Sequence, residues 1–248
     1  GTGAVLAIVA AVFAQFFVIL LFVKAEEPER SPGPLHRIFT DIWQGMRYGF
    51  GNPGIRFLLL MLGGTGLLIR PVIELMPGFA ALEFGRGEDG LAILMSSLGL
   101  GAMLSGLWLA QRGRMAGLTR IIVVGLLVQG TALVLSTLTG GLIWVAAAFL
   151  GAVGAAIVTG TIGSQSLIQN TVISEMRARV MSLFVVISFG LPAFGSLVAG
   201  WVASFVGLPA TFAAGGILTA VLWLWARRLA PALGPELEAG DDGGKKPA

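Results

Sequence analysis

The chain has 248 residues, of which 56% are hydrophobic and only 12% are charged, and its mean hydropathy is +0.89. Soluble proteins carry about 25% charged residues, so this composition excludes an ordinary soluble domain and indicates a membrane protein. The absence of Cys and the presence of one His exclude disulfide scaffolds, thiolate metal sites and multi-histidine metal sites.

The apolar stretches predict an all-α, polytopic membrane helix bundle with seven transmembrane helices. Each stretch is long enough for a spanning helix, which needs roughly 17–25 residues. The predicted spans cover residues 4–23, 54–82, 91–110, 121–138, 142–168, 180–206 and 209–226.

Lys and Arg residues set the direction of these spans. Fourteen of the 16 basic residues fall on one side, which the positive-inside rule makes cytoplasmic. We therefore expect the N-terminus outside and the C-terminus inside. The isoelectric point near 10.0 is explained by these basic residues in the cytoplasmic loops, so no nucleic-acid partner is expected.

The segments outside the spans predict the remaining organisation. Residues 24–34 form a charged, Pro-rich linker, whereas the apolar residues from Leu35 to Phe50 follow helical spacing. The latter predict an amphipathic helix at the cytoplasmic side, either lying on the membrane or packed beneath the spans. We expect four parts, namely a span at 1–23, a cytoplasmic loop at 24–53, a six-helix domain at 54–230 and a disordered tail at 231–248.

Three short segments carry recognisable patterns. The first pattern includes Gly106 near the end of the third predicted span and Gly113 and Arg114 in the loop after it. The turn before the sixth span contains Glu175, Arg177 and Arg179, and that span itself is rich in Gly around Pro192.

In their order, spacing and membrane side, these segments resemble the C-terminal half of a major facilitator superfamily transporter. With Asp41–Tyr48, they are most similar to the enterobactin-exporter-like, or transmembrane secretion effector, branch. Gly106, Gly113 and Arg114 match the superfamily's Gly-x-x-x-Asp-Arg-x-Gly-Arg loop, in which Ala110 and Gln111 here replace the acidic and first basic residues. The resemblance covers nearly the whole chain, with the first span as helix six and the others as helices seven to twelve.

This resemblance implies a secondary active transporter of the bacterial inner membrane that exports hydrophobic or amphipathic small molecules, such as drugs or siderophores, in exchange for protons. It also implies an N-terminal half as a partner. Because residue 1 is Gly and not Met, we expect the chain to be a fragment that does not transport by itself.

Arg70 and Glu74 are ionisable residues inside the second predicted span, where such residues indicate function by default. Their i, i+4 spacing places both on one helix face, so they are expected to neutralise each other. Pro71 lies between them and predicts a kink. The pair fits either a gating helix in which Glu74 carries a proton, or a structural ion pair near the outer interface.

Gln129, Gln165 and Gln169 are the neutral polar candidates for substrate contact. A few such groups in a mainly apolar cavity would suit an amphipathic substrate, although interhelical hydrogen bonds are the common role of buried amides in membrane bundles. Small-residue stripes, one from Ser97 to Ser105 and one from Gly151 to Gly163, predict close helix packing.

Other classes fit the sequence less well. A retinal protein needs a Lys in its last helix, whereas the lysines here are Lys24, Lys245 and Lys246. A permease subunit with a separate ATPase would need a coupling helix, for which Leu35–Phe50 is the candidate, and a lysophospholipid-moving member of the superfamily is a further alternative. Since the chain has no Walker loop, we expect no ATP hydrolysis, no cofactor and no enzymatic activity.

Overall fold

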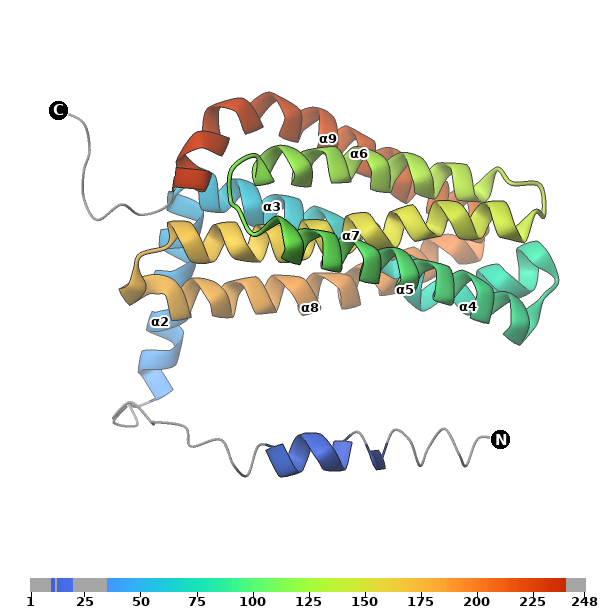
Figure 1. Cartoon of the computed structure of the whole chain (residues 1–248), viewed down its shortest axis with the longest axis horizontal. Helices are drawn as coiled ribbons and strands as arrows, with labels where there is room; N and C mark the ends of the chain where they lie inside the picture. The colour runs from blue at the N-terminus through green and yellow to red at the C-terminus, as the bar shows by residue number, and fades with distance from the viewer. Residues whose placement is uncertain (1–9, 12, 20–34, 240–248) are drawn as a thin grey trace. The chain divides into compact units, whose positions relative to one another are not determined.

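The structure is a computed structural model that describes residues 10, 11, 13–19 and 35–239 (Figure 1). The chain divides into two compact units, Gly1–Phe39 and Thr40–Ala248. In the first unit, residues 10, 11 and 13–19 are helical, and the side chains of Phe13 and Phe16 are exposed. The predicted first span lies largely outside the described residues, and the predicted linker at 24–34 lies wholly outside them.

The second unit contains six helical spans, which confirms six of the seven predicted ones and the all-α class for the described residues. The first of the six consists of two helices, α3 (Pro53–Leu68) and α4 (Pro71–Phe84). The others are α5 (Gly87–Arg112), α6 (Leu118–Thr137), α7 (Ile143–Thr171), α8 (Ser174–Val206) and α9 (Leu208–Ala239).

The spans pack side by side as a bundle. α7 packs against both α5 and α6, α6 packs against α9, and α3 packs against α8 (Figure 1). Two clusters of buried apolar side chains form the core, one around Leu58 and Leu126 and the other around Phe79 and Leu150. By contrast, α5 and α8 bury few of their apolar side chains, as expected for faces that meet lipid or another part of a membrane protein.

The α5–α7 contact confirms the prediction of close packing through small residues. A Cβ added at Gly101 would lie 1.8 Å from the carbonyl oxygen of Gly151, and one added at Gly154 would lie 2.0 Å from that of Leu98. The Ser97 hydroxyl donates a hydrogen bond to the Ala147 carbonyl at 2.5 Å. The two backbones therefore meet directly, and any side chain larger than hydrogen at Gly101 would force them apart.

The span that was predicted as one helix is interrupted between Leu68 and Pro71. Pro71 has no N–H group and begins α4, while the amides of Ile69 and Arg70 both donate to the Thr65 carbonyl, at 2.9 and 3.3 Å. The backbone of α8 lies directly against this break, because a Cβ added at Gly195 of α8 would lie 2.5 Å from the Leu67 carbonyl oxygen. The break is thus a packed feature of the bundle.

The predicted amphipathic helix exists as α2 (Leu35–Gly51). Within Thr40–Ala248, two of its glycines face the bundle, since a Cβ added at Gly45 would lie 3.2 Å from the Arg179 backbone and one at Gly49 would lie 3.4 Å from the side chains of α3 and α8. Trp43 is 65% exposed on another side of the helix. One face of α2 therefore packs on the spans while apolar side chains remain outside.

The prediction of a disordered tail from Pro231 is wrong for residues 231–239, which continue α9. The helix persists through Pro231 and Pro235 because its far end is anchored to the bundle. Leu237 is fully buried in the core, and the Glu238 carboxylate accepts hydrogen bonds from the amides at the start of α6. Residues 240–248 lie outside the described part of the chain.

Candidate functional site

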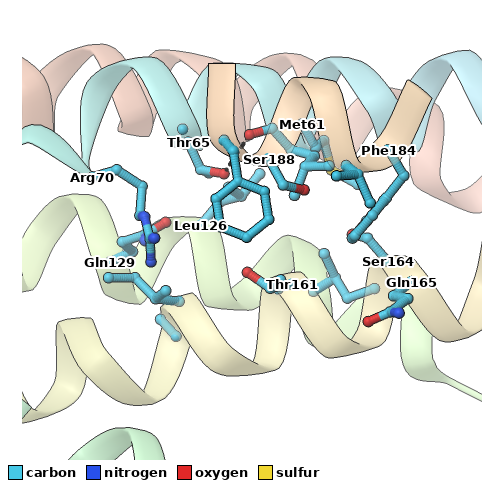
Figure 2. A pocket seen from close by; sticks show the side chains of 18 residues that line it. Met61, Thr65, Arg70, Leu126, Gln129, Thr161, Ser164, Gln165, Phe184 and Ser188 are labelled. Carbon is cyan, nitrogen blue, oxygen red and sulfur yellow. Dashed lines mark hydrogen bonds between the residues drawn. The ribbon is translucent and has the colours of Figure 1, made fainter. Parts of the chain in front are cut away.

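A cavity of about 400 Å³ lies among α3, α6, α7 and α8 (Figure 2). Its wall is mainly apolar and includes Met61, Leu126 and Phe184. The polar side chains that line it are Thr65, Arg70, Gln129, Thr161, Ser164, Gln165 and Ser188. Arg70 and Gln129 lie toward one end of the cavity, and Gln165 and Phe184 lie toward the other (Figure 2).

The break in the first described span places Arg70 at the cavity. Arg70 is the residue that precedes α4, and its side chain is exposed. Helix formation is weakened just before it by Gly63, Gly64 and Gly66, since Gly is a poor helix former. The sequence thus supplies both the weak end of α3 and the proline that begins α4.

Several polar groups of the cavity have no hydrogen-bond partner within the described residues. Gln129 and Ser164 are each 2% exposed, and the side chain of neither makes a hydrogen bond there. The buried Ser188 hydroxyl also lacks a partner. Buried polar groups are normally paired, because an unpaired one costs about 1–3 kcal/mol. These groups are therefore free to bind water or a ligand.

The structure brings some of the predicted site residues together and separates others. Arg70, Gln129 and Gln165 all line the cavity, whereas Glu74 and Gln169 do not line it and are exposed. Within the described part of the chain, Arg70 and Glu74 form no ion pair. Their expected mutual neutralisation is thus not seen, because the break at Pro71 interrupts the helix whose register would align them.

The predicted loop pattern after the third span has a clear backbone role. Gly113 ends α5 in the left-handed conformation, with φ of 58°, which Gly adopts without steric cost. Gly106 faces Val158 of α7 at an ordinary contact distance, and Arg114 is exposed in the loop. Arg112 donates a hydrogen bond to the carbonyl of Ala116 and so closes this turn.

The second pattern forms the start of α8. Glu175 lies in its first turn, where a carboxylate interacts favourably with the helix dipole. Arg177 is exposed, and Arg179 lies against Gly45 of α2. This segment therefore joins α2 to the bundle and does not line the cavity.

Pro192 lies inside α8 and contacts the break region of α3. A Cβ added at Gly66 would lie 3.3 Å from the Pro192 ring. Because proline has no N–H group, the Ser188 carbonyl loses its usual helical partner. Ser188 lines the cavity and was not among the residues predicted from the sequence, although its position four residues before Pro192 is a signal that could have indicated it.

A helical membrane bundle with an interrupted span and an inner cavity of unpaired polar groups is the kind of structure expected of a membrane transporter. The family model for transmembrane secretion effectors matches residues 1–240, and the chain belongs to this family of major facilitator-type transporters. This confirms the family resemblance. No curated protein matches the chain.

Proposed function

We propose that the protein is a secondary active transporter that exports hydrophobic or amphipathic small molecules, and that the cavity binds them. The observation that carries this proposal is that Gln129 and Ser164, each 2% exposed, line a mainly apolar cavity and have no side-chain hydrogen-bond partner among the described residues. A volume of about 400 Å³ falls within the range of small-molecule pockets, roughly 300–1,000 Å³. Drugs and siderophores as substrates, and protons as the coupling ion, follow from the family resemblance.

Transport by this superfamily involves two six-helix halves around a site near the membrane midplane. We propose that residues 54–230 form the C-terminal half, that residues 1–23 form the helix before it, and that residues 24–53 connect the halves. The partner is then an N-terminal half. The exposed apolar faces of α5 and α8 and the interruption between α3 and α4 support a bundle that rocks against such a partner.

The proposed location is the bacterial cytoplasmic membrane, with the N-terminus outside and the C-terminus inside. Arg112 ends α5 and Arg114 lies in the loop after it, and Arg177 and Arg179 lie in the first turns of α8, just after the end of α7. In contrast, the turns after α6 and α8 carry no basic residue. This asymmetry supports the proposed orientation through the positive-inside rule.

Filling the cavity tests the proposal. Gly160 lines the cavity and a Cβ there meets nothing within 4 Å, so Gly160→Phe would occupy the binding space without a backbone clash. The assay measures uptake of neutral, anionic and cationic dyes into inverted membrane vesicles that carry a pH gradient and contain the chain together with an N-terminal half. We expect at least one dye to accumulate, and we expect Gly160→Phe to reduce that uptake at least tenfold at equal protein level.

Gly99→Phe is the matched control. Gly99 lies on α5 outside the cavity, and a Cβ there also meets nothing within 4 Å. We expect this variant to transport like the unmodified protein. Uptake of none of the dyes, or equal uptake by Gly160→Phe and the unmodified protein, would contradict the proposal.

A further inference from the structure

We infer that the Arg70 end of the cavity is an anion subsite, and that the substrates are amphipathic organic anions. Such a molecule has one carboxylate, sulfonate, phosphate or phenolate head on an apolar ring or chain. The inference rests on the proposed function, because it assumes that the cavity holds the substrate. It adds the charge of the substrate and the residues that recognise it.

The charge of the cavity is one-sided. Among the described residues that line it, Arg70 is the only charged one, and none is acidic. The guanidinium group of Arg70 makes no salt bridge or hydrogen bond within the described part of the chain, and it forms no ion pair with Glu74 there. A guanidinium group cannot lose its charge in a protein, so inside a membrane it needs a counter-charge. An anionic substrate would supply one.

Gln129 provides an independent second contact. Its side chain is 2% exposed, has no hydrogen-bond partner within the described residues, and lies toward the same end of the cavity as Arg70 (Figure 2). A carboxamide can donate two hydrogen bonds, and a guanidinium donates in a planar fork that matches the oxygens of a carboxylate or sulfonate. Together they form a donor set suited to an oxyanion.

The rest of the cavity suits an apolar body. Met61, Leu62, Leu126 and Phe184 line it, and the polar groups farther along are neutral. A cationic molecule would meet Arg70 without a carboxylate to balance it, and a neutral one would leave Arg70 unpaired. Among molecules of equal size, the arrangement therefore favours the one with a negative head.

Three matched probes test the inference, namely naphthalene-2-sulfonate, the neutral naphthalene-2-sulfonamide and the cationic 2-naphthylmethylammonium. Equilibrium binding is measured on the full-chain protein in lipid nanodiscs, with empty nanodiscs subtracted. We expect the sulfonate to bind roughly tenfold more tightly than the cation. Arg70→Gln should remove this preference by weakening sulfonate binding about tenfold, with the sulfonamide unchanged, and Arg70→Lys should retain most of it.

The controls separate this inference from the proposed function. Arg86→Gln removes an arginine outside the cavity and should leave all three affinities unchanged. Gly160→Phe should weaken all three probes. Two results would contradict the anion subsite alone, provided that Gly160→Phe weakens all three probes. One is that the unmodified protein shows no charge preference, and the other is that Arg70→Gln weakens every probe equally. The proposed function of the cavity would not be contradicted by either. If no probe binds, or if Gly160→Phe leaves binding unaffected, both the subsite and the proposed function are contradicted.

Discussion

At the scale of single residues, Pro71 prevents the four-residue spacing of Arg70 and Glu74 from pairing their side chains. In a continuous helix, residues four apart lie on one face and opposite charges there attract each other. Here α3 ends at Leu68 and α4 begins at Pro71, and the two side chains form no ion pair within the described residues. Only Arg70 lines the cavity. The two residues are therefore available for separate roles.

Glu74 is the candidate for the coupled proton, because among the carboxylates in the described spans it is the one that lies away from the ends of its span. If it carries the proton, Glu74→Gln should abolish uptake driven by a pH gradient, with at least a tenfold loss. Exchange of labelled for unlabelled substrate, which needs no net proton movement, should persist. Both are measured in proteoliposomes that contain the chain together with an N-terminal half, with Glu83→Gln on the same helix as control. Undiminished gradient-driven uptake by Glu74→Gln would exclude this role.

At the scale of helices, the α5–α7 pair shows how small residues allow two spans to touch. Hydrogen bonds accompany the close approach, because the Ser105 hydroxyl lies 2.8 Å from the Ala155 carbonyl oxygen and 2.8 Å from the Thr159 hydroxyl. In a membrane, where apolar side chains gain little by leaving lipid, such close packing and hydrogen bonding supply much of the attraction between helices.

Gly101 is the position at which the α5–α7 contact leaves the least room for an added side chain. In Gly101→Ala the new Cβ would overlap the Gly151 backbone, which cannot rotate away as a side chain can. We expect a loss of about 1–3 kcal/mol, the usual cost of overpacking, seen as a lower thermal denaturation temperature of the purified protein. Gly99→Ala, two residues earlier and facing open space, should match the unmodified protein. Equal stability of the two variants would mean that α5 and α7 lie farther apart.

The sequence predicted these helices and their small-residue contact well, because hydropathy and residue size are local properties. It predicted the cavity less completely. Gln129 and Gln165 were recognisable as polar residues in apolar spans, but Ser188 gains its importance from packing between four helices. The separation of Arg70 from Glu74 was also missed, since Pro71 was expected to bend the helix and in fact begins a new one.

At the scale of the whole molecule, the end of α9 connects helices that are distant in sequence. The Glu238 carboxylate accepts hydrogen bonds from the amide of Gly117 at 2.5 Å and from that of Thr119 at 2.9 Å. The Leu237 carbonyl accepts from the side chains of Asn170 and Thr171 at the end of α7. Since Glu238 and Gly117 are 121 residues apart, no local pattern could predict this link, and the segment's Pro and Gly content pointed to disorder.

Glu238 acts as the N-terminal cap of α6, because Gly117 has no side chain to serve that function. A carboxylate there pairs with free amides and with the helix dipole, so Glu238→Ala should cost about 1 kcal/mol. It should also accelerate amide hydrogen exchange at residues 117–121, measured by mass spectrometry. Glu236→Ala removes a neighbouring exposed carboxylate and should change neither quantity. If amide exchange in both variants matches that of the unmodified protein, Glu238 does not stabilise the start of α6, and residues 231–239 are not anchored to the bundle.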